Sequence, residues 1–135
     1  ETDTPFLVSG DTLFNAGAGN CHNGGEPSIL YQTFAEVLSR LPDATRLLPG
    51  HNYLENNLGF SLDREPGNEL ARAARSAARD TPFEIRTLGV ERGYNPFMRL
   101  ASEEIHAELQ RAFPSRNLER PESRFLALRE LRNKW

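Results

Sequence analysis

The sequence predicts an α/β fold over residues 1–52, followed by a mostly α-helical domain over 53–135. Two short apolar runs, at 6–8 and 45–48, flank an amphipathic segment, and the order strand, helix, strand is a crossover unit. Beyond residue 53 the strand signal largely disappears, while helix-capping residues recur. These observations place a boundary between two architectures near residue 53.

The α/β part is expected to begin with a strand at 6–8 that stops at Ser9-Gly10. A loop rich in Gly and Asn follows over 15–27, and the second strand covers 45–48. The helix between them is amphipathic, so we expect it to pack on the sheet. Its apolar positions are Ile29, Leu30, Phe34, Val37, Leu38 and Leu41.

Three helices are predicted in the second part from their first residues. Asn68 is expected to cap a helix that runs to about residue 79, and Ser102 to cap another. Pro121 opens the last helix, which ends at Trp135. The segment 81–96 is punctuated by Gly and Pro, which predicts a connector.

Asp11 and His51 each follow the end of a predicted strand. The carboxyl ends of strands in an α/β sheet are where ligands bind, so the two side chains are expected at one site. Carboxylates suit hard divalent metals and imidazoles suit borderline ones. Taken singly, Asp11 would more often form a turn and His51 bond a backbone carbonyl. Their strand context favours a metal site.

The segments 10–14 (GDTLF) and 49–53 (PGHNY) resemble the second half of the metallo-β-lactamase-fold hydrolases, and within them the glyoxalase II (hydroxyacylglutathione hydrolase) family. The resemblance continues through 55–60, 65–68, 94–99 and 129–132. It implies the second half of an αββα sandwich followed by a helical substrate-binding domain. It also implies that Asp11 bridges two divalent metal ions and orients the hydrolytic hydroxide, and that His51 binds one ion. Zinc, iron and manganese all remain open.

The HxHxDH motif that supplies most metal ligands in this family is absent, because the chain has three histidines at unrelated spacings. We therefore expect these 135 residues to be a C-terminal part of a longer enzyme. Two ligands are too few for a catalytic zinc site. The isolated chain is accordingly predicted to be inactive.

The resemblance also implies residues that bind the thiol carrier, glutathione. Tyr53 matches a ligand-contacting tyrosine, and Arg129 with Arg132 matches a basic pair that holds the glycyl carboxylate. Asn20 and His22 stand where the family commonly has a basic and an aromatic residue in the rim loop. These departures leave the thiol carrier open, since Asn20 can bond a carboxylate only without charge assistance.

The last helix points to the same residues independently. At 100° per residue, Arg132 falls inside an apolar arc and Arg129 at its edge. A charge inside an apolar arc requires a partner. That partner could be a ligand, an internal salt bridge, or solvent reached by snorkelling.

The resemblance implies hydrolysis of an S-acyl glutathione, such as S-lactoylglutathione, to the acid and glutathione. Two alternatives remain: another enzyme of the superfamily, such as a persulfide dioxygenase, or a non-catalytic binding or assembly module. The persulfide dioxygenases resemble this chain mainly up to PGH. The adjacent Cys21 and His22 are not expected to form a nucleophilic pair, because neighbouring side chains in an extended loop point to opposite faces.

Composition excludes several partners. A net charge of −3 without a basic, aromatic-rich stripe argues against nucleic acid. No apolar run approaches the length of a membrane span. A single cysteine rules out an intramolecular disulfide, which favours a reducing cytoplasm. Half a sandwich would leave apolar strand faces uncovered, so self-association is expected.

Overall fold

A parallel strand pair forms the α/β part. In the computed structural model, which describes residues 3–135, β1 (Phe6–Gly10) pairs in parallel with β4 (Arg46–Pro49). Leu7 lies opposite Leu47, and Gly10 lies opposite Pro49. The crossover unit predicted from the sequence is thereby confirmed, and the carboxyl ends of both strands meet at one edge.

The crossover helix is less regular than predicted. α1 (Pro27–Gln32) continues into a π-helical turn, Thr33–Val37, and a 3₁₀ turn, Leu38–Arg40. Phe34 and Leu38 are buried as expected, but Ile29 and Val37 are each 56% exposed, so their assignment to the packed face was wrong. A π turn inserts an extra residue and rotates the later part of the helix, and periodicity alone does not reveal which part of a wide apolar arc meets the core.

A small hairpin follows β1 directly. β2 (Leu13–Phe14) and β3 (Gly17–Ala18) pair antiparallel around Asn15 and Ala16, and all six residues are buried. This hairpin was not predicted, since strands of two residues leave no alternation in the sequence. Ala16 adopts φ 57, a left-handed conformation that is uncommon outside glycine.

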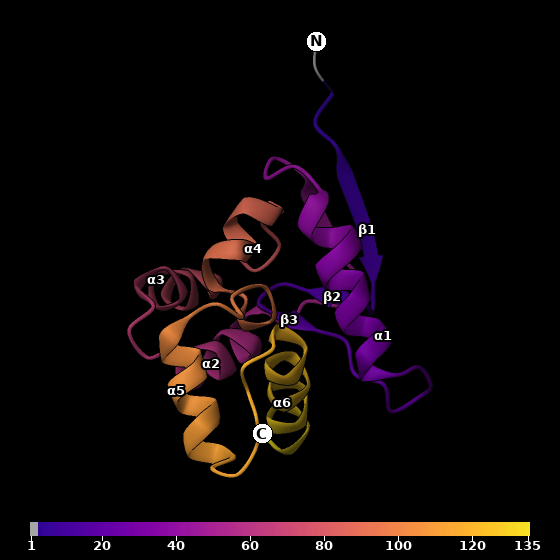
Figure 1. Cartoon of the computed structure of the whole chain (residues 1–135). Helices are drawn as coiled ribbons and strands as arrows, with labels where there is room; N and C mark the ends of the chain where they lie inside the picture. The colour runs from indigo at the N-terminus through magenta and orange to yellow at the C-terminus, as the bar shows by residue number, and fades with distance from the viewer. Residues whose placement is uncertain (1–2) are drawn as a thin grey trace.

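The second part consists of helices, as predicted. Asn68 caps α3 (Glu69–Ala78) by accepting from the Ala71 amide, and Ser102 caps α5 (Glu103–Ala112) by accepting from the Ile105 amide. α6 (Pro121–Lys134) begins at the predicted proline. α2 (Leu54–Arg64) was not predicted as a helix. Figure 1 shows β1 and α1 on one side of the molecule and α3 and α5 on the other, with the hairpin between them.

The predicted connector 81–96 is in part a helix, which corrects that expectation. α4 (Leu88–Tyr94) contains Gly89 and Gly93, the residues that suggested punctuation. A β-carbon at Gly89 would lie 3.1 Å from Asp43, and one at Gly93 would lie 2.9 Å from Leu70. These glycines allow close packing of neighbouring segments, so they do not mark turns.

One aromatic cluster joins the two parts. The Phe125 ring of α6 lies 5.2 Å from Phe34 of the crossover segment and 5.2 Å from Phe97, both in edge-on geometry. Full burial of each such side chain is worth about 1.5–3 kcal/mol. The α/β part and the helical part therefore share a core. No helix within residues 3–135 has the length and apolar character needed to cross a membrane.

Candidate metal and anion site

The two predicted metal ligands lie together at the end of the strand pair. His51 Nε2 is 3.5 Å from Asp11 Oδ1, and both side chains are largely exposed. The Gly50 amide donates to the Gly10 carbonyl at 2.8 Å, which ties the two strand ends together. A β-carbon at Gly50 would come within 2.8 Å of the Asp11 carboxylate. Glycine at position 50 is thus required for this approach.

The spacing of these two donors suits a shared metal ion. Oxygen and nitrogen ligands about 2.1 Å from one tetrahedral ion lie about 3.4 Å apart. The 3.5 Å separation between Asp11 and His51 matches two corners of such a site, and it is long for a direct hydrogen bond. Across residues 3–135, no group of three or more His, Cys, Asp or Glu side chains could enclose a metal. Asp11 and His51 are therefore too few to enclose a metal ion by themselves.

Two aromatic rings, of Tyr53 and Phe14, pack against the His51 imidazole. The imidazole stacks on Tyr53, with 5.2 Å between ring centroids and 12° between planes. Phe14 of β2 packs edge-on against Tyr53 at 5.0 Å and contacts His51 at 6.2 Å. The hairpin thereby orients both residues of the PGHNY segment that were singled out from the sequence.

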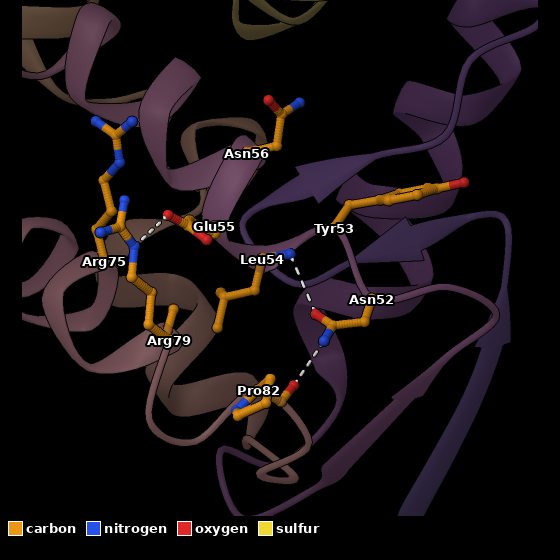
Figure 2. A pocket seen from close by; sticks show the side chains of 9 residues that line it. Asn52, Tyr53, Leu54, Glu55, Asn56, Arg75, Arg79 and Pro82 are labelled. Atoms are coloured by element: carbon orange, nitrogen blue, oxygen red, sulfur yellow. Dashed lines mark hydrogen bonds and ion pairs between the residues drawn. The ribbon is translucent and has the colours of Figure 1, made fainter.

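Tyr53 also borders an open cavity of about 600 Å³ between the start of α2 and the end of α3. Its lining includes Asn52, Glu55, Arg75 and Arg79, and Glu55 accepts from Arg79 Nε at 2.8 Å. Figure 2 shows the Tyr53 ring directed away from both arginines. The Tyr53 ring therefore points away from the part of the cavity that the two arginines line.

Arg129 is more buried than the helical arc predicted. It is 5% exposed, whereas Arg132 is partly exposed and Trp135 is 46% exposed. The buried face of α6 therefore holds Phe125 and Leu128 as predicted, but it extends to Arg129 and not to Trp135. Arg129 Nη1 donates to the carbonyls of Ala18 and Gly19 at 2.7 and 2.9 Å. The hairpin docks on this side of α6, and helical periodicity contains no information about that partner.

Arg132 is held by neutral groups as well. Its Nη2 donates to Asn57 Oδ1 at 3.3 Å, and its guanidinium lies over the rings of Phe60 and Trp135 at 5.9 and 5.3 Å. Within the described chain, neither Arg129 nor Arg132 forms an ion pair with a carboxylate. The positive charge of the two arginines is thus not balanced by a carboxylate of the described chain.

Burial affects both arginines, and the charge of Arg132 affects Arg129 as well. Burial, and secondarily the neighbouring charge of Arg132, lowers the pKa of Arg129 to about 10. Burial also lowers the pKa of Arg132. Two guanidinium groups that are both disfavoured as cations, and that lack a protein carboxylate, form a site that an anion would stabilise.

Asn20 and His22, the residues predicted to lie in the rim loop, make few contacts. Asn20 and His22 are exposed, and Asn20 Oδ1 accepts from the His22 backbone amide at 3.1 Å. Neither side chain is brought to Asp11 or His51 by a hydrogen bond in residues 3–135. The loop does start at Ala18 and Gly19, whose carbonyls bind Arg129.

Two buried polar residues that matter for this geometry were missed by the sequence reasoning. Asn57 lies on α2 against Arg132, and Glu91 lies on α4 against the hairpin turn. Asn57 lies at helical spacing from the buried Leu54 and Ser61 and next to the buried Leu58. A polar residue on such a face is a readable signal, because burial requires it to have partners.

Comparisons with known proteins identify one family. Residues 52–135 match the family model described as hydroxyacylglutathione hydrolase C-terminus. Proteins named hydroxyacylglutathione hydrolase from Nitrosococcus oceani and Polaromonas sp. are each 51% identical over 99% of this chain and 52% of their own length. One from Anaeromyxobacter dehalogenans is 42% identical over 95% of the chain. The chain spans about half the length of these curated relatives.

Proposed function

We propose, from the premise that this chain belongs to the hydroxyacylglutathione hydrolase family, that it supplies the thiol-carrier site and part of the metal site of a thioester hydrolase. The substrate would be an S-acyl glutathione such as S-lactoylglutathione, and the products the free acid and glutathione. The observation that carries this proposal is the arginine pair, Arg129 and Arg132, held only by neutral groups among the described residues.

The arginine pair would bind the glycyl carboxylate of glutathione. A carboxylate placed between two guanidinium groups accepts charge-assisted hydrogen bonds, which are roughly twice as strong as neutral ones. Arg129 anchors the hairpin through Ala18 and Gly19, and Arg132 lies on the more open side of α6. Tyr53 would contact the same ligand, and Asn20 and His22 would face it from the rim loop.

Asp11 and His51 would hold divalent metal, with the remaining ligands coming from outside the described residues. Bound metal supplies a Lewis acid that polarises the thioester carbonyl and lowers the pKa of the attacking water. Asp11 would orient that water, and the ring of Tyr53 would keep His51 aligned by stacking. Zinc suits this donor pair, as do iron and manganese.

The strand pair would belong to an αββα sandwich of the metallo-β-lactamase type. Val8 is 78% exposed and Phe6 54% exposed on β1, although strands in sandwiches bury such side chains. We propose that another sheet covers them in the complete enzyme, and that the isolated chain self-associates through the same residues.

The test is a chimera that joins the first half of the Nitrosococcus oceani relative to this chain. Asp11→Ala should abolish hydrolysis of S-lactoylglutathione and reduce bound metal. Arg132→Ala should lower kcat/KM by about 10- to 150-fold with metal content unchanged, since a charge-assisted contact is worth roughly 1.5–3 kcal/mol. Arg111→Ala, on the exposed face of α5, is the matched control.

The substrate assignment is checked by a second thioester whose thiol lacks the glycyl carboxylate. The wild-type chimera should prefer the glutathione substrate, and Arg132→Ala should lose that preference. An Arg132→Ala chimera that kept the full preference would contradict the carrier assignment, while metal-dependent hydrolysis could still stand.

A further inference from the structure

We infer that Asn57 is a positioning residue that orients Arg132 toward an anionic ligand without neutralising its charge. This inference rests on the proposed function, because it assumes that Arg132 binds a carboxylate. Asn57 itself is 4% exposed and lies on α2, so its role is exerted through Arg132.

The orientation of the Asn57 amide is set by its two neighbours. Its Nδ2 donates to the Asn15 carbonyl at 3.0 Å, and that carbonyl can only accept. Its Oδ1 therefore faces the other way, where it accepts from Arg132 Nη2 at 3.3 Å. The amide bridges the hairpin turn and α6, which are 42 and 75 residues away in the sequence.

The space for this amide is left open by Gly17. A β-carbon at position 17 would lie 2.6 Å from Asn57 Nδ2, too close for any side chain. The Asn57 amide thus contacts the hairpin on one side and Arg132 on the other. A substitution at Asn57 would therefore alter a direct contact of the Arg132 guanidinium.

Arg132 is restrained by one hydrogen bond and two aromatic contacts. Asn57 accepts from Nη2, and the guanidinium carbon lies over the rings of Phe60 and Trp135. Its Nε and Nη1 form no hydrogen bond within residues 3–135. These donors remain for a ligand, and the aromatic contacts limit the directions in which they can point.

A neutral amide at position 57 serves this arrangement better than a carboxylate. An aspartate would have almost the same shape, but it would repel the Asn15 carbonyl and form an ion pair with Arg132. The Glu65–Arg99 pair shows what such pairing does elsewhere in this chain, since two carboxylate oxygens occupy Arg99 at 2.8 and 2.7 Å. Asparagine orients Arg132 and leaves its positive charge available to a ligand.

The experiment measures Kd by titration calorimetry for two ligands, glutathione and glutathione ethyl ester, which lacks the glycyl carboxylate. The wild-type chain should bind glutathione at least tenfold more tightly than the ester. Asn57→Asp should reduce this preference by about tenfold, because the new carboxylate competes for Arg132. Asn56→Asp makes the same charge change on the exposed neighbour and should keep the preference within twofold.

Asn57→Ala provides a second measurement if the aspartate variant does not fold. It removes the orienting oxygen without adding charge, and the preference should fall at least threefold in a chain whose circular dichroism is unchanged. A wild-type preference that persists in both folded variants would overturn the inference and leave the proposed function intact. Absence of any preference in the wild-type chain would instead remove the proposed function, and the inference with it.

Discussion

Two arginine environments in this molecule differ in how their charge is balanced. Arg99 donates from Nε and Nη2 to the two oxygens of Glu65, at 2.8 and 2.7 Å. Arg129 and Arg132 instead contact carbonyl and amide oxygens. The first arrangement joins structural segments through an ion pair, whereas the second leaves both positive charges without a carboxylate among the described residues. The two environments therefore differ in whether the protein itself balances the arginine charge.

Both oxygens of the Glu65 carboxylate accept hydrogen bonds from several side chains. Besides Arg99, Ser102 Oγ and Asn68 Nδ2 donate to the same carboxylate, at 2.9 Å each. Burial acts to raise the pKa of Glu65, but these hydrogen bonds and the Arg99 charge together hold it below its usual value. These hydrogen bonds connect the α2–α3 turn to the start of α5. Each oxygen of Glu65 already accepts from two donors, so no acceptor position is left for an external ligand.

Glu91 is a third case, a buried carboxylate with neutral donors. It is fully buried, and it accepts from Asn15 Nδ2, the Ala16 amide, Tyr94 Oη and Asn95 Nδ2. Burial raises the pKa of Glu91. Glu91 thus resembles Arg132 in having only neutral contacts, but it differs in being closed off from solvent, whereas Arg132 is partly exposed.

The largest expected effect comes from breaking the structural pair. Glu65→Ala leaves Arg99 without its carboxylate and should destabilise the chain by about 3 kcal/mol, the low end for a buried pair because Arg99 is partly exposed. Urea unfolding followed by circular dichroism measures this. Glu69→Ala, which removes the exposed partner of Arg72, should cost less than about 1 kcal/mol. Equal losses in the two variants would show that the Glu65–Arg99 pair is no more structural than a surface pair.

An intermediate effect is expected at Glu91. Each of its oxygens accepts from two donors, so Glu91→Gln places an amide N–H₂ against donors in either orientation. The expected loss is about 2 kcal/mol in the same unfolding assay. Glu119→Gln, an exposed change of the same kind, should be neutral. A Glu91→Gln chain as stable as the wild type would show that the carboxylate is protonated and already donates a hydrogen.

The smallest effect is a pH dependence of opposite sign at the two carboxylates. The pKa of Glu65 is lowered on folding, so its contribution is present above the usual value of 4.5 and is lost as pH falls through the folded pKa. The pKa of Glu91 is raised, so the stability associated with it is greatest below 4.5 and declines as pH rises through the folded pKa. Unfolding curves from pH 3 to pH 7 on the wild type, Glu65→Gln and Glu91→Gln separate the two slopes. Identical slopes in both variants would contradict this assignment.

The parts of the fold that depend on neighbours in sequence were predictable. The Asn68 and Ser102 caps act within three residues, and the crossover unit requires that the ends of β1 and β4 meet, which brings Asp11 close to His51. The hairpin, α4 and the burial of Arg129 were not predictable in this way. Gly89 and Gly93 are explained by packing against Asp43 and Leu70, and Arg129 by carbonyls 110 residues earlier. Contacts between residues so far apart in the sequence produce no periodic pattern from which they could be predicted.

The contact between Arg129 and the hairpin has a consequence for the order of events during synthesis. The carbonyls of Ala18 and Gly19 leave the ribosome more than a hundred residues before the guanidinium that binds them. Until α6 emerges, these carbonyls must be satisfied by water, and Arg132 has not yet met Asn57. The contacts that hold Arg129 and Arg132 therefore cannot form before α6 has been synthesised, although their partners on the hairpin and α2 are made earlier.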